Sequence, residues 1–270
     1  MEKVEDKQPP YQSKAEIVDP RWKNLYIIGG AAALISAALG IIEVTIETSG
    51  SSLTSSPTTV LGWFTLLQSN RLLGLALLGI FESVLFPLSV LMYLAFYPAL
   101  RQTSASLTLS AFFINLISAV AYLATNIAFS MLSLSNQYAT ATTDTQRSML
   151  LAAGQAMLAT SQGTGFNMAF VLGSVAGLVV SVVMLKSKAF NKPTAIVGII
   201  GNALGIPISV LGPIVGAISG LFLLVWIILV GIRFFQLAIS KKRNFHDAQA
   251  TSTNLETNMH AMAAKDSMRR

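Results

Sequence analysis

The sequence contains no cysteine, few charged residues and only two histidines. Asp, Glu, Lys and Arg make up 11% of its 270 residues, whereas soluble domains typically carry about 25%. Without cysteine the chain can form no disulfide, thiolate metal site or thiol nucleophile. Because both histidines, His246 and His260, stand near the C-terminal end, no apolar segment offers the ligands of a haem or of a His/Glu metal site. We therefore predict no metal and no cofactor.

Catalytic motifs are missing as well. The chain has neither a glycine-rich Lys-Ser/Thr phosphate loop nor a Gly-x-Ser-x-Gly nucleophile elbow. No two carboxylates stand close together within an apolar run. These absences lead us to expect a protein that is not an enzyme.

Long apolar runs are what the sequence does contain. Hydrophobic residues make up 53% of the chain, and the mean hydropathy is +0.62. Because a helix needs about 20 apolar residues to cross a bilayer, the pattern predicts an all-α fold, a polytopic membrane protein built as a bundle of six transmembrane helices. The predicted spans cover approximately residues 24–46, 71–98, 106–134, 165–185, 194–211 and 214–239.

These spans form one predicted membrane domain over residues 24–239. The polar tails, 1–23 and 240–270, are expected to be disordered. The first run is longer and starts later than the apolar region of a signal peptide, so a span is the preferred interpretation.

Two connecting segments are predicted to touch the membrane surface. Residues 57–68 are moderately apolar but too short to span, so we expect them at the interface. Residues 143–160 place Met149, Leu150 and Met157 near one helical face, which predicts an additional amphipathic surface helix. This helix lies on the surface or packs against the bundle; the alternative is that it extends the fourth span into solution.

The basic residues indicate the orientation. With both termini in the cytoplasm, only Arg71 and Arg147 of the 18 Lys and Arg residues fall on the opposite side. The positive-inside rule places the basic side in the cytoplasm. We therefore predict a multi-pass protein of the plasma membrane with cytoplasmic termini. The net charge of +6 is then explained by contact with the lipid bilayer, and we expect no nucleic-acid partner.

Glycines four positions apart recur in three of the predicted spans, and the first span has Ala33 and Ala37 at the same spacing. The pairs are Gly173 and Gly177, Gly201 and Gly205, and Gly216 and Gly220. Such pairs let helices approach closely in a bilayer. We interpret them mainly as contacts within the bundle, with a homo-oligomer or a membrane partner protein as the alternative use.

Glu82 is the one carboxylate in the second predicted span. It stands about eleven residues, or about 16 Å at the helical rise, from the start of its run. This predicts a position near the bilayer midplane, where an ionised acid costs about 3 kcal/mol. Glu82 is then either a proton- or cation-binding group or a neutral acid that hydrogen-bonds a neighbouring helix.

Further polar residues accompany Glu82 in a candidate intramembrane polar site: Asn115, Asn126, Asn167, Asn202 and Glu43. Asn115 and Asn126 are about three helical turns apart and therefore share nearly one face. The set either lines a polar interior or supplies hydrogen bonds between helices that contribute roughly 0.6 kcal/mol each.

Three stretches carry a resemblance to a known family. They are RLLGLALLGIFESVLFPLSVLMYLAFYPAL from Arg71, QRSMLLAAGQAMLAT from Gln146 and GSVAGLVVSVVMLKSKAFNKPTAIVGIIGNALGI from Gly173. Over residues 25–237 the chain resembles a family of small bacterial and archaeal six-span membrane proteins, a domain of unknown function. The resemblance implies a fold but no activity, substrate or site.

Two functions are open on this sequence. The first is a structural, sensing or partner-binding membrane component in which Glu82 is structural. The second is a small transporter or ion-coupled permease in which Glu82 is the coupling site.

Overall fold

The computed structural model describes residues 20–49, 57–207, 211–212 and 214–239. Within these ranges every regular element is a helix and no strand occurs, as predicted for an all-α fold. Four helical stretches there are long and apolar enough to cross a membrane, which indicates a membrane protein. They are Lys23–Ile46, Glu82–Thr140, Asp144–Lys186 and Ile214–Ile239.

The described helices follow one another in chain order. They are η1 (Pro20–Trp22), α1 (Lys23–Ser49), α2 (Val60–Ser69), α3 (Arg71–Leu77), α4 (Glu82–Thr125), α5 (Ala128–Thr140), α6 (Asp144–Ser161), α7 (Thr164–Lys186) and α8 (Lys192–Gly205). The helix Ile214–Ile239, called the last helix below, follows them. Residues 20–23, predicted as tail, are helical. The predicted disorder of 1–19 and 240–270 concerns residues outside the described ranges and stays a prediction.

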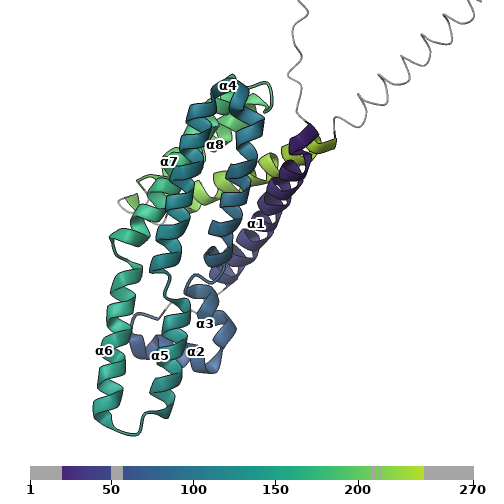
Figure 1. Ribbon diagram of the computed structural model, residues 1–270. Helices are drawn as coiled ribbons and strands as arrows, with labels where there is room; N and C mark the ends of the chain where they lie inside the picture. The colour runs from purple at the N-terminus through teal and green to yellow at the C-terminus, as the bar shows by residue number, and fades with distance from the viewer. Residues whose placement is uncertain (1–19, 50–56, 208–210, 213, 240–270) are drawn as a thin grey trace, which may run out of the picture.

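α4 folds back on itself. Ser104 has φ −160° and ψ 95°, which is not helical, and the chain reverses there (Figure 1). Phe86 and Tyr122, from opposite ends of α4, stack with ring centroids 4.2 Å apart. We call residues 82–103 the first limb and 105–125 the second limb; together they form an antiparallel hairpin.

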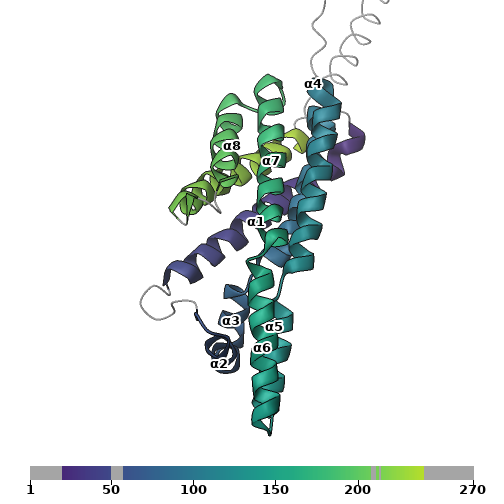
Figure 2. The same ribbon diagram turned by 90° about the vertical axis from the view of Figure 1, so that its left-hand side faces the viewer.

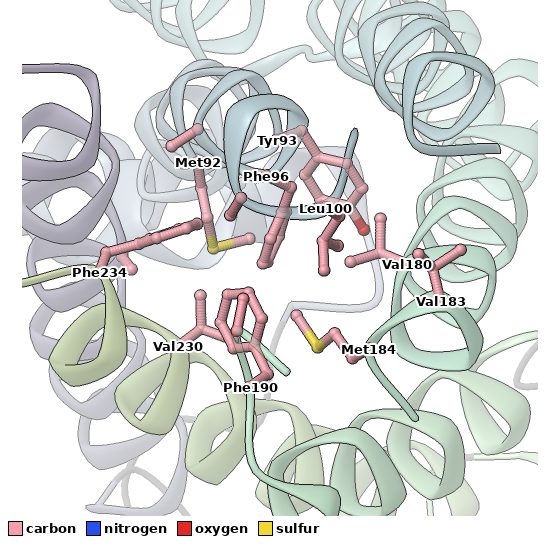
Figure 3. Close-up of a cluster of buried hydrophobic side chains, with 14 of the residues drawn as sticks. Met92, Tyr93, Phe96, Leu100, Val180, Val183, Met184, Phe190, Val230 and Phe234 are labelled. Carbon is pink, nitrogen blue, oxygen red and sulfur yellow. The ribbon is translucent and has the colours of Figure 1, made fainter. Parts of the chain in front are cut away.

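The main core lies between α1, the two limbs of α4, α7 and the last helix (Figure 3). Phe96 stands at its centre, with its ring centroid 5.0 Å from that of Phe234, 5.7 Å from Phe190 and 6.0 Å from Trp226. Aromatic pairs at such separations contribute about 0.5–1.5 kcal/mol beyond burial. This cluster holds together the ends of helices that are far apart in the sequence.

Small residues bring α7 and α8 close together. A methyl group on Gly177 would collide with the side chain of Asn202, and one on Gly205 would lie 2.5 Å from the Ser174 Oγ. These contacts confirm the predicted role of such glycines in packing within the bundle. Gly220 is different, because no atom of the described residues lies within 4 Å of a methyl group placed there.

A second group of helices extends beyond this core (Figures 1 and 2). α5 runs on from the second limb of α4, α6 runs into α7, and α2 packs against α5 and α6. Phe64 and Leu67 of α2 are buried in one cluster with Ile127 and Met131. We call α2, α3, α5 and α6 the lobe.

α6 was predicted as an amphipathic surface helix. It packs against α5 and α2, where a methyl group on Gly154 would lie 3.1 Å from the Phe64 Cζ. It also continues the direction of α7 (Figure 1). The alternative prediction, in which this segment extends the fourth predicted span, therefore agrees with the direction of α6.

Two predicted span limits are wrong. The run 106–134 is interrupted after Thr125, where α4 ends. The run predicted to reach residue 211 ends as a helix at Gly205, and Pro207 has no backbone N–H with which to continue the helical hydrogen bonds.

Candidate functional site

The second predicted span is broken at a turn. α3 ends at Leu77, the turn 78–81 follows, and α4 begins at Glu82. The prediction of one continuous helix over 71–98 is therefore wrong. Gly79 adopts φ +85°, a left-handed conformation that only glycine reaches without steric cost. Glu82 thus stands at the start of a helix and not in the middle of one.

The Gly79 carbonyl oxygen collects the hydrogen bonds at this turn. It accepts from the Asn126 Nδ2 at 2.9 Å, the Ser83 Oγ at 3.1 Å and the Tyr122 hydroxyl at 3.4 Å. The Asn126 Nδ2 also lies 3.3 Å from the Tyr122 hydroxyl oxygen, to which it donates. Because Tyr122 and Asn126 stand at the far end of α4, these bonds join the turn to the end of the second limb.

The Glu82 carboxyl group points into the same small volume. An atom at the Cβ position of Gly79 would lie 2.5 Å from the Tyr122 hydroxyl, 3.1 Å from the Asn126 Nδ2 and 3.2 Å from the Glu82 Oε2. Glu82 is half-buried as a residue, but its Oε2 atom is buried and receives no hydrogen bond from any described residue. A carboxyl, a phenol and an amide therefore converge where Gly79 leaves room by having no side chain.

Glu43 approaches this site from α1. The charges of Glu82 and Glu43 both act on the Tyr122 hydroxyl, and α1 packs along α4. The structure thus brings Glu82 and Asn126, two of the predicted site residues, together at Gly79, and the charge of Glu43 acts on the Tyr122 hydroxyl from α1.

Aromatic rings close the site on its inner side. Phe86, one helical turn after Glu82, stacks on Tyr122 with centroids 4.2 Å apart. Phe170 of α7 meets both rings edge-on, with centroids 5.7 Å from Phe86 and 5.8 Å from Tyr122. Phe166 lies 6.0 Å from Tyr122. The polar groups therefore face an apolar layer toward the bundle and the turn 78–81 toward the lobe.

Asn126 also forms the break between α4 and α5. Its Oδ1 accepts a hydrogen bond from the Ala128 backbone amide at 3.1 Å, a local bond that competes with continued helix. Because its Nδ2 also donates to the Gly79 carbonyl, the Asn126 side chain forms hydrogen bonds at two helix breaks, the one before α4 and the one after it.

Asn167 serves the break between α6 and α7. Its Nδ2 donates to the carbonyl oxygens of Gln162 and Gly163, both at 3.0 Å. This break adjoins the end of α4, because a methyl group on Gly165 would lie 2.7 Å from the Thr125 Cγ2. Three helix breaks consequently lie side by side between the main core and the lobe, and we call this region the junction.

The remaining predicted residues lie elsewhere in the bundle. Asn115 donates to the Ser89 Oγ at 3.0 Å, between the two limbs of α4. Asn202 is buried between α8 and α7, and its Nδ2 donates to the Gly198 carbonyl at 2.7 Å. The Asn115 bond joins the two limbs of α4, whereas the Asn202 bond stays within α8, and the structure brings neither residue to the junction.

Tyr122 is the site residue that sequence reasoning missed. It stands one turn before Asn126 and about two turns after Asn115, so it shares the helical face on which the asparagines were noticed. A polar side chain on a face already marked by two asparagines was the available signal. Gly79 carried no comparable signal, because glycine is frequent in membrane helices.

The groups at the junction can exchange hydrogen bonds and a proton. Among the described residues, no three His, Cys, Asp or Glu side chains are grouped as a metal ion would require. The junction offers one buried carboxyl oxygen without a donor, one phenol and one amide.

One family model matches most of the chain. Residues 25–240 match the family described as Domain of unknown function (DUF4386). The chain belongs to this family. No curated protein and no solved structure matches the chain.

Proposed function

We propose that the chain is a six-span plasma-membrane protein with cytoplasmic termini that serves as a sensing or partner-binding component and not as an enzyme. The spans are α1, the two limbs of α4, α7, α8 and the last helix. α8 is the shortest, since its 14 residues rise about 21 Å, and it packs along α7. An even number of spans keeps both termini on one side of the membrane.

Basic residues support the orientation. Arg101 lies over the Trp22 ring at 5.7 Å, and the Arg233 Nε donates to the Ala189 carbonyl at 2.6 Å. These contacts join the start of α1, the reversal in α4, the α7–α8 link and the last helix at the end opposite the lobe (Figure 1). The link also carries Lys186, Lys188 and Lys192. The positive-inside rule assigns such an end to the cytoplasm.

The lobe is the observation that carries the proposed role. α5 and α6 project away from the main core (Figures 1 and 2), and most residues of α6 are exposed. A shallow groove between them is lined by Ser130, Ser133, Leu134, Ala153, Ala156 and Met157. A projecting helix pair does not lengthen a path across the bilayer, but it does offer a surface to a partner or to a sensed molecule.

Single-cysteine labelling tests this arrangement, because the natural chain has no cysteine. Ser133→Cys lies on exposed α5, and Lys188→Cys lies in the exposed α7–α8 link. We expect a membrane-impermeant maleimide to label Ser133→Cys on intact cells and Lys188→Cys only after permeabilisation. Labelling after permeabilisation gives the total amount of each variant. The opposite pattern would contradict the orientation, and protection of Ser133→Cys in both conditions would contradict an accessible lobe.

The alternative is a small transporter or ion-coupled permease that uses Glu82 as an intramembrane coupling site. A carboxyl group at a discontinuous helix favours it, because transporters bind ions where helices are interrupted. Glu82→Gln in reconstituted vesicles separates the two functions. A folded variant that loses a pH-dependent flux seen in the wild type supports the permease. A wild type without flux supports the sensing or partner-binding role.

A further inference from the structure

We propose that Glu82 and Tyr122 form a binding site for one exchangeable proton at the junction between the main core and the lobe. This inference deepens the proposed sensing function and rests on it for the compartment involved, because it names the proton as what the junction binds. It stands on the hydrogen bonds around the Gly79 carbonyl and on the buried Glu82 oxygen.

The buried Oε2 of Glu82 is the first group of the proposed site. A carboxylate oxygen can only accept hydrogen bonds, whereas a protonated carboxyl group can also donate one. No described residue donates to the Oε2, and leaving a buried acceptor unsatisfied costs about 1–3 kcal/mol. A carboxyl group that carries a proton suits this arrangement, because it can donate toward the Tyr122 hydroxyl oxygen beside it.

The Tyr122 hydroxyl is the second group of the proposed site, because it can donate its hydrogen either to the Gly79 carbonyl or to the Glu82 carboxylate. Its hydrogen is directed to the Gly79 carbonyl at 3.4 Å, long for an O–H donor whose usual distance is about 2.7–2.8 Å. When the Glu82 O–H bond breaks, its electron pair stays on the carboxylate and the proton passes to water. The Tyr122 hydroxyl then turns its hydrogen from Gly79 to the charged carboxylate, which is the stronger acceptor.

Release of the proton therefore changes the junction. The Gly79 carbonyl loses the Tyr122 bond but keeps those from Asn126 and Ser83. The positive end of the α4 helix dipole stabilises the new charge, because Glu82 stands in the first turn of α4. The site can consequently exist in both states without unfolding of either limb.

The charged groups around the site favour holding one proton. Glu43, from α1, adds a second carboxylate whose charge acts on Tyr122, and two nearby carboxylates are unfavourable when both are ionised. Arg71 of α3 donates to Asn136 in the lobe. Lys23 at the start of α1, Arg101 late in the first limb and Lys186 at the end of α7 stand at the helix ends far from Glu82, and Arg147 stands in the first turn of α6, at the far end of the lobe. α7 presents neutral Asn167 and the Phe166 and Phe170 rings.

The proposed orientation identifies the compartment that supplies the proton. The first limb from Glu82 to Arg101 rises about 28 Å at 1.5 Å per residue, close to the roughly 30 Å of a bilayer core. With Arg101 at the cytoplasmic face, Glu82 stands at the outer boundary and exchanges its proton with the side of the lobe.

Infrared difference spectroscopy on the full chain in liposomes tests the proton site directly. We expect the wild type to gain a carboxylic-acid carbonyl band on acidification, because protonation converts a carboxylate to a carboxylic acid. Glu82→Gln should abolish this band. Tyr122→Phe should keep it but move its midpoint to higher pH, because the carboxylate loses a donor. Glu43→Gln is the matched control, and it should keep the band and move its midpoint to lower pH.

Three results would overturn the inference. They are a wild type without a titrating band above the exposed-carboxylate background, a band that survives Glu82→Gln but not Glu43→Gln, and a midpoint that Tyr122→Phe leaves unchanged. The wild-type spectrum decides the first even where a variant fails to fold. Cysteine labelling of the lobe is measured separately, so a failed orientation and a failed proton site give different results.

Discussion

The Asn115 Nδ2 donates a hydrogen bond to the Ser89 Oγ at 3.0 Å, although the two residues stand 26 positions apart within α4. In a straight helix that separation would be about 39 Å. The bond exists because α4 reverses at Ser104, and it places the predicted Asn115 between two limbs of one hairpin.

Cross-linking checks this reversal. Ser89→Cys combined with Asn115→Cys should be joined within the monomer by a short bifunctional thiol reagent, since the native side chains are in contact. Ser89→Cys with Phe113→Cys is the control, because Phe113 is 51% exposed on another face of the same limb. Mass spectrometry of the digested chain reads the link. An unlinked first pair, or equal yields for both pairs, would contradict the hairpin.

Gly79→Ala should destabilise the protein by at least about 1–2 kcal/mol, the cost of a left-handed backbone for a residue with a Cβ. The new methyl group would also lie 2.5 Å from the Tyr122 hydroxyl. Chemical unfolding in detergent micelles measures the change, with Gly220→Ala as the control because that position is open. Equal stability of both variants would show that the turn at Gly79 is not as described.

Gly177→Ala should destabilise the contact between α7 and α8. The methyl group would collide with Asn202, whose amide is committed to the Gly198 carbonyl at 2.7 Å. Overpacking of this kind typically costs about 1–3 kcal/mol. The double variant with Asn202→Ala should recover part of the loss, and a double-mutant cycle in the same unfolding assay quantifies the coupling. Strictly additive effects would count against direct contact.

Arg233→Met should lower stability by about 1.5–3 kcal/mol, the usual range for hydrogen bonds from a charged donor. The half-buried guanidinium donates to the Ala189 carbonyl at 2.6 Å and to the Gln236 Oε1 at 3.0 Å. Gln236→Ala removes only the exposed second bond and should change stability by less than about 0.5 kcal/mol. A similar loss in both variants would mean that the link to Ala189 contributes little.

The sequence predicted the helical class. It also predicted, to within about three residues, the limits of α1, α7 and the last helix, because those apolar runs end at charged or polar residues. It failed at the turn before Glu82, where LALLGIF offers only apolar residues and one glycine. Hydropathy cannot separate a glycine inside a helix from one at φ +85°. The break arises from tertiary bonds that Tyr122 and Asn126 make to the Gly79 carbonyl.

The sequence predicted part of the candidate site. Glu82, Asn126 and Glu43 were recognisable as polar residues in apolar runs; Glu82 and Asn126 do meet at Gly79, and the charge of Glu43 reaches Tyr122. Asn115 and Asn202 look identical to Asn126 in sequence, yet each is satisfied by a neighbouring hydroxyl or carbonyl group. Which asparagine joins a site depends on the folding back of α4, which occurs at Ser104.

The lobe and the main core differ in how firmly their backbone amides are protected. Gly154 is the buried residue of α6, whereas α7 buries residues along most of its length. Segments with few buried contacts open at a lower free energy and exchange amide hydrogens sooner. The helix pair α5–α6 should therefore exchange well before α4 and α7, although the chain runs through all of them. A partner that covers the lobe would slow exchange there and leave the spanning helices unaffected.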